Sequence, residues 1–396
     1  MVGIAEGRKT ALVFGASGIS GWAFVNEILQ DYPRPGVWNK VHALTNRSLP
    51  RHVSLWPDDP RLNIVSGIDL LSCSHKEIAR MMESRIDGIQ KVTHVYFLAY
   101  KASEDFEEEI EDAVVMLQRA IKAVDQLCPA LEFVVLQTSA KMYGCHLLEN
   151  RPRLPLPLSE SLPRLGQPFY DALFHHEQLD WLSSYAAFKR WNWCETRPDI
   201  IVGFVPHQNA YSLATILGVF LTMYKEIEGA GAQCPFPGTV KSWDAKSNDS
   251  SSDMIARQTL HLSLTLPPDR KGEAFNVADS RSCETWSSKW PQLCAYFGLK
   301  GTPPAEEGQS IEVRAYIQMN LAKRREMEKK YGLRSGIVAS ELTMRGFEYF
   351  LLTGFDFDRQ YDMSKMYEST GFSEEREVMD AWGVAFDRMR AARMIP

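Results

Sequence analysis

The sequence predicts an α/β protein with a doubly wound parallel sheet that carries helices on both faces, followed by a smaller lobe. Five apolar segments alternate with segments of helical periodicity, which is typical of such a sheet. The segment Val92–Ala99 is predominantly apolar, as expected of a parallel strand buried on both faces. A glycine-rich turn joins the first strand to the first helix. We therefore expect a Rossmann-type domain over residues 1–203. Residues 204–396 should form a mixed α/β, largely helical lobe, with a possible return of a strand and a helix to the sheet.

The first strand, Ala11–Phe14, leads into the turn Gly15-Ala-Ser-Gly-Ile-Ser-Gly21 and then into an apolar-periodic helix. This order is the context of a dinucleotide-binding fingerprint, in which the helix N-terminus receives the pyrophosphate. Gly15 allows a sharp turn, Gly18 lets the backbone approach the phosphates, and Gly21 lets the helix pack closely on the strand. The G-x-x-G-x-x-G spacing resembles that of short-chain dehydrogenases. The expected cofactor contacts here are Gly15, Ser17, Gly18, Ile19, Ser20 and Gly21.

The second strand, Lys40–Thr45, ends at Asn46, Arg47 and Ser48, where the adenosine ribose of a nicotinamide cofactor is expected. NAD enzymes usually place a carboxylate here, whereas Arg47 can pair with a 2′-phosphate. The sequence therefore favours NADPH over NADH. After the third strand, Leu62–Val65, we expect Asp69 and Leu70 to lie near the adenine. The alternative for Asp69 is a carboxylate that stabilises a helix N-terminus.

The rest of the chain continues the alternation of strands and helices. The acidic run 107–111 is interpreted as a solvated helix face. A proline-rich loop interrupts the pattern, because its Pro-x-Pro spacing prevents a helix or strand from running through it. The expected elements are a helix from Ser103 to Leu127, a strand at Leu131–Gln137, the loop Arg151–Pro168, a helix at Phe169–Tyr185, a strand at Trp193–Val202 and a short strand at Glu273–Val277.

Composition excludes several classes of protein. The formal net charge of −6 over 396 residues gives no basic surface for nucleic acid. Seven scattered cysteines without a C-x-x-C pair predict neither disulfides nor a zinc site, and no third ligand accompanies His207 or the pair His175–His176. The N-terminus has no apolar signal region, and the longest apolar stretch, near Ile216–Met223, is too short to cross a bilayer. We expect a cytoplasmic protein without a metal or a membrane partner.

The candidate catalytic residues depart from the usual short-chain reductase pattern. Such a reductase carries Tyr and Lys four residues apart on one helix face, so that the ammonium and the phenol lie together. Tyr170 is followed four residues later by Phe174, so the ammonium must come from elsewhere. Lys141 is the obvious source, because it lies just after the fifth strand, whose end faces the nicotinamide in such folds.

These motifs resemble the progesterone 5β-reductase/iridoid synthase-like family, an atypical branch of the extended short-chain dehydrogenases/reductases. The resemblance covers nearly the whole chain, and the displaced lysine makes it specific. Its motifs stand here as Leu136-Gln-Thr138-Ser-Ala-Lys141-Met-Tyr143, Pro168-Phe-Tyr170-Asp171, Arg197-Pro198-Asp-Ile-Ile201-Val-Gly-Phe204, Tyr211-Ser212-Leu213, Trp243-Asp244 and Glu273-Ala-Phe-Asn-Val277.

The resemblance implies NADPH-dependent 1,4-reduction of an α,β-unsaturated carbonyl compound. Tyr170 would bind the carbonyl oxygen as negative charge develops on it, and Lys141 would hold the cofactor ribose and make the site electropositive. Tyr143, Phe204 and Trp243 would contact an apolar biosynthetic intermediate. The remaining expected cofactor contacts are Ala99, Tyr100, Thr138, Lys141, Tyr170, Pro198, Ile201, Ser212 and Leu213.

Two alternatives remain open at this point. The first is a carbonyl (1,2-) reductase in which Tyr170 protonates the alkoxide. The second is a non-redox protein that binds NADP(H), such as a cyclase, an isomerase or a regulator. The resemblance also makes a homodimer plausible.

Overall fold

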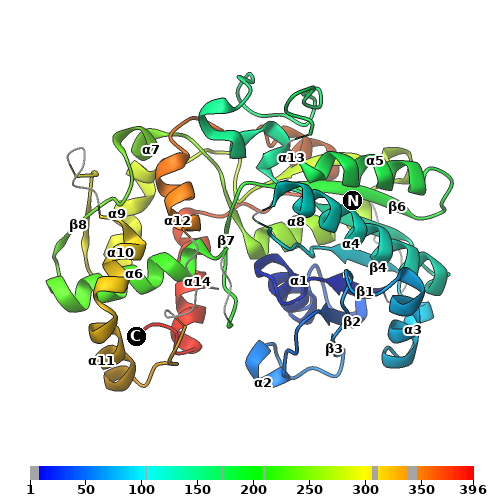
Figure 1. Ribbon diagram of the computed structural model, residues 1–396, viewed down its shortest axis with the longest axis horizontal. Coiled ribbons are helices and arrows are strands. Elements are labelled where there is room, and N and C mark those ends of the chain that lie inside the picture. Colours follow the sequence, from blue (N-terminus) through cyan, green and yellow to red (C-terminus); the bar gives the residue numbers. More distant parts are fainter. Residues whose placement is uncertain (1–8, 104, 172, 208–210, 306–310, 338–345) are drawn as a thin grey trace.

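The computed structural model describes residues 9–396 except 104, 172, 208–210, 306–310 and 338–345 (Figure 1). Its centre is a seven-stranded parallel sheet with the strand order β10-β6-β5-β4-β1-β2-β3. The strands are β1 (Lys9–Phe14), β2 (Trp38–Thr45), β3 (Leu62–Ser66), β4 (His94–Phe97), β5 (Phe133–Gln137), β6 (Asn192–Pro198) and β10 (Glu273–Val277). The predicted fold class is confirmed, and each of the first five predicted strands overlaps an observed one.

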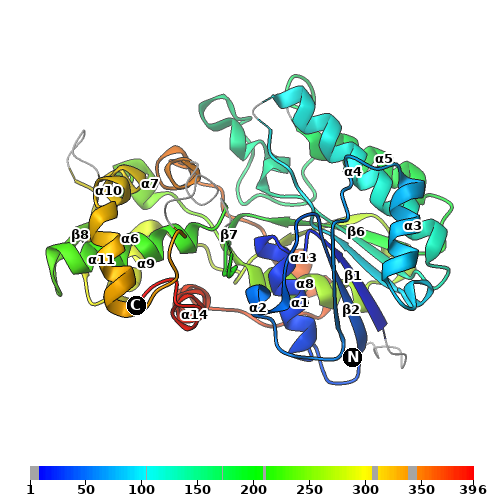
Figure 2. The same ribbon diagram turned by 60° about the horizontal axis from the view of Figure 1, so that its bottom comes forward.

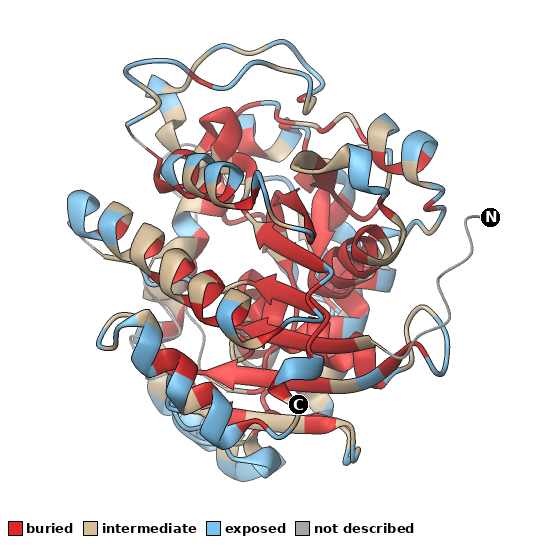
Figure 3. Cartoon of the chain, turned by 90° about the vertical axis from the view of Figure 1, so that its right-hand side faces the viewer, coloured by how far each residue is buried: buried red, intermediate tan, exposed pale blue. Residues whose placement is uncertain are grey.

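Helices cover both faces of this sheet (Figures 1 and 2). Along β1, Ala11 and Val13 belong to the core on one side, while Leu12 and Phe14 belong to the core on the other side. This alternation buries both faces of the strand, which is why its sequence is continuously apolar from Ala11 to Phe14. Figure 3 shows the strands as the most buried part of the molecule. One face carries α1 (Ile19–Leu29) and α8 (Ser252–Thr265), and the other carries α3 (His75–Arg85), α4 (Phe106–Leu127) and α5 (Phe174–Ala186).

The predicted strand Trp193–Val202 is divided in the structure, which corrects that prediction. After β6 the chain leaves the sheet, and β7 (Ile200–Val202) pairs with β9 (Asp249–Ser251) instead. Between β6 and β7, the N–H of Asp199 donates to Ser250 Oγ at 3.0 Å. The Asp199 carboxylate forms a buried ion pair with Arg359 at 3.0 Å. These contacts turn the backbone away from β10 and toward the second lobe.

The predicted helix Phe169–Tyr185 also begins later than expected. Helix α5 starts at Phe174, because Leu173 has an extended backbone with φ −152° and ψ 110°. Tyr170 therefore lies in the loop before the helix and not in its first turn, although its N–H still donates to the carbonyl of Gly166 at 3.1 Å.

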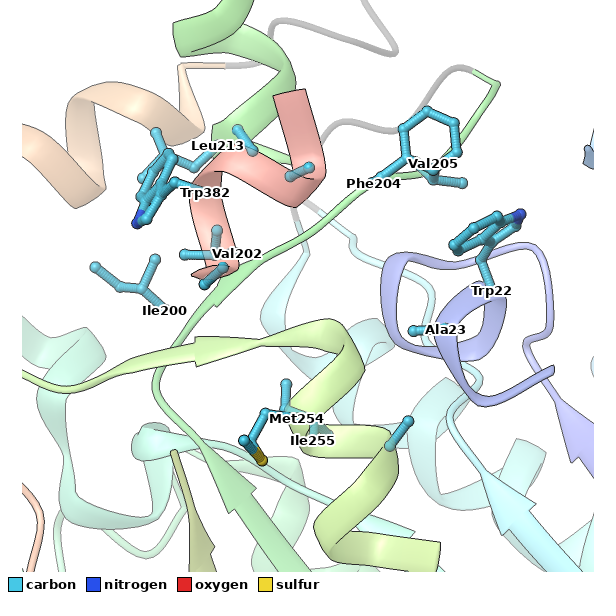
Figure 4. Packing of buried hydrophobic residues seen from close by; sticks show 14 of the residues in the cluster. Trp22, Ala23, Ile200, Val202, Phe204, Val205, Leu213, Met254, Ile255 and Trp382 are labelled. Atoms are coloured by element: carbon cyan, nitrogen blue, oxygen red, sulfur yellow. The ribbon is translucent and has the colours of Figure 1, made fainter. Parts of the chain in front are cut away.

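The second lobe packs directly against the sheet layer. Trp22 of α1 and Phe204, which follows β7, form an edge-to-face pair with centroids 5.0 Å apart (Figure 4). The C-terminal helix α14 (Val378–Ala391) reaches both lobes, since Arg388 pairs with Asp253 of α8 at 2.8 Å. The other elements of the second lobe include α6 (Leu213–Glu228), α7 (Val240–Asp244), α9 (Trp286–Tyr296), α10 (Val313–Met319), α11 (Leu321–Tyr331), α12 (Phe347–Tyr349) and the paired strands β8 (Gln233–Pro235) and β11 (Lys300–Thr302). Helix α13 (Ser364–Thr370) lies instead against β10, where Lys365 donates to the carbonyl of Ala274 at 2.9 Å. The split at residue 203 stays a prediction, but α8 and β10, which follow it, are part of the sheet layer.

Candidate active site

The glycine turn after β1 is closely packed at the carboxyl edge of the sheet. Gly15 has φ +77°, and a Cβ there would lie 2.7 Å from the carbonyl oxygen of Leu98. A Cβ on Gly21 would lie only 2.2 Å from the carbonyl oxygen of Gly15. Helix α1 then begins after Gly18 without a side-chain cap, so its first amides stay available to an anion. The turn and the helix start fit a dinucleotide pyrophosphate.

A histidine and an arginine from the second lobe lie beside this turn. His207 Nε2 donates to the carbonyl oxygen of Ser17 at 2.7 Å, so the segment after β7 lies directly on the turn. Arg334, from beyond α11, donates to the neighbouring carbonyl of Pro206. Burial lowers the pKa of His207, and the positive charges of Arg334 and Arg47 lower it further. No local motif marks His207 or Arg334, so their place at this turn could not be predicted from the sequence.

The residues expected at the adenosine differ in their surroundings. Asn46, Arg47 and Ser48 are exposed. Asp69 accepts hydrogen bonds from the Leu71 N–H at 2.8 Å and the Ser72 hydroxyl at 2.6 Å. These bonds, above all that from the Ser72 hydroxyl, lower the pKa of Asp69. Asp69 thus caps the turn that follows it, whereas the next helix, α3, begins at His75 and is capped by Ser74. A contact of Asp69 with adenine stays a prediction.

Lys141 lies in a short 3₁₀ turn, Ala140–Tyr143, immediately after β5. Its ammonium faces two aromatic rings, with 5.6 Å to the centroid of Tyr100 and 5.4 Å to that of Phe174. Among the described residues no carboxylate lies within ion-pair distance of Lys141. Burial lowers the pKa of Lys141, and the negative charge of Glu109 opposes that shift. Phe174 stands where a short-chain reductase usually carries its lysine. It thus packs against Lys141, which comes from the turn after β5.

Tyr170 is held apart from Lys141 by its own set of polar contacts. Its hydroxyl donates to Asp180, and its ring stacks on His176 with centroids 4.7 Å apart. Arg164 donates to Asp180 and to His176 Nδ1. The hydrogen bond to Asp180, with its charge, raises the pKa of Tyr170. No ring contact or hydrogen bond joins Tyr170 and Lys141 in the part of the chain that the structure describes.

A buried polar network lies beneath this edge of the sheet. Thr138 donates to Glu195 at 2.6 Å, and Arg197 binds both oxygens of the same carboxylate at 2.8 and 2.9 Å. Tyr143, expected to contact substrate, donates instead to Asn276 at 2.7 Å and is 4% exposed. Thr138 and Tyr143 therefore support the site from below and present little surface to a ligand.

Other predicted contacts are also engaged in packing. Phe204 and Leu213 are buried (Figure 4). Ser212 is also buried, and it caps α6 by accepting from the Thr215 N–H at 3.2 Å. Trp243 is half-buried against Phe236, with centroids 5.3 Å apart. The buried set also includes Ile19, Ser20, Gly21, Leu70 and Pro198, whereas Ser17, Gly18, Ala99 and Ile201 are half-buried and Tyr100 is exposed. The ligand contacts predicted for these residues remain predictions.

Within the described ranges, no group of three His, Cys, Asp or Glu side chains is arranged to hold a metal ion. In the same ranges, no helix has the length and hydropathy that a membrane crossing requires.

Comparison with known proteins is consistent with this geometry. The "PRISE-like Rossmann-fold domain" family model matches residues 11–396. A protein named "Short chain dehydrogenase ausT" from Aspergillus calidoustus is 34% identical over 99% of this chain and 95% of its own length. The Arabidopsis thaliana "3-oxo-Delta(4,5)-steroid 5-beta-reductase" is 28% identical over 98% of this chain and 94% of its own. The Bordetella bronchiseptica enzyme WbmG, solved in complex with NAD, superposes with a TM-score of 0.61 at 13% identity, covering 98% of this chain and 96% of that one.

The solved structure shows only that the fold is shared, whereas the sequence relatives also show the class of protein. They are named as dehydrogenases and reductases, which confirms the expected oxidoreductase and the family resemblance. With a family model that spans nearly its whole length, the chain belongs to the PRISE-like family of Rossmann-fold short-chain dehydrogenases/reductases.

Proposed function

We propose that the protein is an NADPH-dependent reductase of α,β-unsaturated carbonyl compounds. The observation that carries this proposal is the position of Lys141, a desolvated ammonium at the end of β5, at the same edge of the sheet as the glycine turn. NADPH, when bound, supplies a hydride to the β-carbon of the substrate. The relatives' names support a reductase, and that of the Arabidopsis protein refers to reduction beside a 3-oxo group.

Different residues of this chain would bind the parts of the cofactor and polarise the substrate carbonyl. The Gly15–Gly21 turn and the start of α1 would hold the pyrophosphate, and Arg47 would pair with the 2′-phosphate. Lys141 would hold the nicotinamide ribose and keep the pocket electropositive. Such a field favours negative charge on a carbonyl oxygen over its immediate protonation.

Tyr170 would bind that oxygen through its hydroxyl, after exchanging Asp180 for the substrate. A tyrosine phenol is protonated at neutral pH, and in the structure it already donates to a negatively charged oxygen, that of Asp180, as it would to the enolate oxygen. The name of the Arabidopsis relative, a steroid 5-beta-reductase, supports 1,4-reduction over 1,2-reduction.

The test is NADPH consumption with a cyclic enone, an enal and a steroid enone, together with product analysis. We expect a saturated ketone or aldehyde, and a loss of about 10²-fold in kcat for Tyr170→Phe. Tyr185→Phe is the matched control, since Tyr185 also donates to a carboxylate, Asp125, at 2.9 Å, but at the far end of α5. An allylic alcohol as product would contradict the proposal and indicate carbonyl reduction.

Cofactor choice gives a separate prediction. Arg47→Ala should reduce the ratio of kcat/KM for NADPH to that for NADH by about tenfold, since an exposed charge-assisted contact with a 2′-phosphate is worth about 1.4 kcal/mol. The two coenzymes are compared at fixed ionic strength, with Arg80→Ala as the control, because Arg80 is exposed on α3. An unchanged ratio in Arg47→Ala would remove Arg47 from the cofactor site.

A further inference from the structure

Glu109 is buried, unlike the other acidic residues of the run 107–111. Glu107, Glu108 and Glu111 are exposed on α4, whereas Glu109 is only 8% exposed. This corrects the interpretation of the whole run as a solvated helix face. On the helix, Glu109 lies four residues before the buried Ala113, so it continues the buried stripe toward the carboxyl edge of the sheet.

Tyr100 connects Glu109 to the Lys141 site. The Tyr100 hydroxyl donates to Glu109, and its ring stacks on Phe174 with centroids 5.6 Å apart and planes 20° apart. The same two rings face the Lys141 ammonium. Tyr100 is 42% exposed, so burial alone does not fix its ring, and the hydrogen bond to Glu109 supplies a second anchor.

We propose that Glu109 is a positioning residue of the Lys141 site: it holds the Tyr100 hydroxyl so that the Tyr100 ring covers one side of the Lys141 ammonium, and among the described residues it provides the counter-charge that acts on Lys141. The proposal rests on the proposed function, in which Lys141 acts on the cofactor and substrate. Tyr100 contacts the ammonium through its ring, and Glu109 acts through Tyr100 and through its charge. Together they keep a lysine charged and oriented without an ion pair that would neutralise its field.

The charged and titratable groups around Lys141 determine in which direction the pKa of Lys141 should change when the charge of Glu109 is removed. They are Glu109 from α4, His175 from the start of α5, and Tyr100 from the segment after β4. Burial lowers the pKa of His175 to about 3, so its imidazole is neutral in the range where a lysine titrates. Among the described residues, the carboxylate of Glu109 is then the one charge that favours the protonated amine. Removing it should lower the pH at which Lys141 loses its proton.

The experiment measures the titration of Lys141 directly in the full-length protein without substrate. Acetic anhydride labels only unprotonated amines, and mass spectrometry of the peptide that contains Lys141 gives the extent of labelling between about pH 7 and 11. Glu109→Gln keeps a hydrogen-bond acceptor for Tyr100 but removes the charge. We expect its labelling midpoint to fall by about one pH unit, and the alkaline limb of kcat/KM to move with it.

Two further variants separate charge from anchoring. Glu108→Gln is the control for charge, because Glu108 is exposed in the same turn and pairs with Lys101 at 3.3 Å, so its midpoint should stay at the wild-type value. Tyr100→Phe keeps the ring but removes its anchor, and we expect kcat/KM to fall about tenfold. Equal midpoints in Glu109→Gln and wild type, or equal shifts in Glu109→Gln and Glu108→Gln, would overturn the proposal. Labelling needs no turnover, so this result is independent of whether any enone is reduced.

Discussion

Lys141→Met is expected to lower kcat for enone reduction by about 10²- to 10³-fold while the free energy of unfolding stays within about 1 kcal/mol of the wild-type value. The ammonium is desolvated and, among the described residues, has no hydrogen bond or ion pair, so the fold gains little from its charge. A methionine thioether of similar length fits between the rings of Tyr100 and Phe174, where sulfur–aromatic contacts are favourable. Loss of activity without loss of stability would separate function from folding at this position.

The measurements are steady-state kinetics and urea unfolding of the same preparations. Lys101→Met is the matched control, since Lys101 is exposed next to Tyr100 and pairs with Asp112 at 2.5 Å and with Glu108. We expect this variant to keep its activity. Retained turnover in Lys141→Met, or unfolding in place of inactivation, would contradict the role given to this lysine.

Gly21→Ala is expected to destabilise the protein by about 2–3 kcal/mol and to weaken NADPH binding by at least about 100-fold. The added Cβ would lie 2.2 Å from the carbonyl oxygen of Gly15 and 2.7 Å from the Cα of Ala16. Both are backbone atoms, so the turn itself must move, and α1 must move away from it. Urea unfolding and titration of NADPH fluorescence measure the two effects.

Gly383→Ala provides the matched glycine substitution. In α14 the new Cβ would meet only the Cε of Met379, at 3.6 Å, which is an ordinary van der Waals distance. Because alanine favours helix more than glycine does, this variant should be neutral or more stable by about 0.5–1 kcal/mol. Similar destabilisation in both variants would show that the Gly21 result does not come from the crowded turn.

The fold was predictable because its signals are local. Predominantly apolar runs such as Val92–Ala99 need no tertiary information to indicate buried parallel strands, and the glycine turn is constrained by its own backbone. The break between β6 and β7 was not predictable in this way. It depends on Arg359, far away in the sequence, which pairs with Asp199.

The site was less predictable, for the same reason. Helical periodicity runs through 169–173, and the chain offers no capping residue that would mark Phe174 as the true start of α5. The position of Tyr170 against Asp180 and His176 follows from that late start. Glu109, in contrast, could have been found, since its spacing from Ala113 places it on the buried stripe of α4. Its partner Tyr100 comes from another strand end, and no local pattern joins the two.

The strand order also determines when the sheet can be completed while the chain is being synthesised. Strand β6 pairs with β5 on one side and β10 on the other, and β10 is made only after β7, α6, β8, α7, β9 and α8. The face of α1 that α8 covers stays bare until Thr265 has been translated, and one edge of β6 stays open until Val277 has been translated. An open edge beside an apolar face invites association with other nascent chains. Translation that pauses between β6 and β10 should therefore prolong the most aggregation-prone period in the life of this protein.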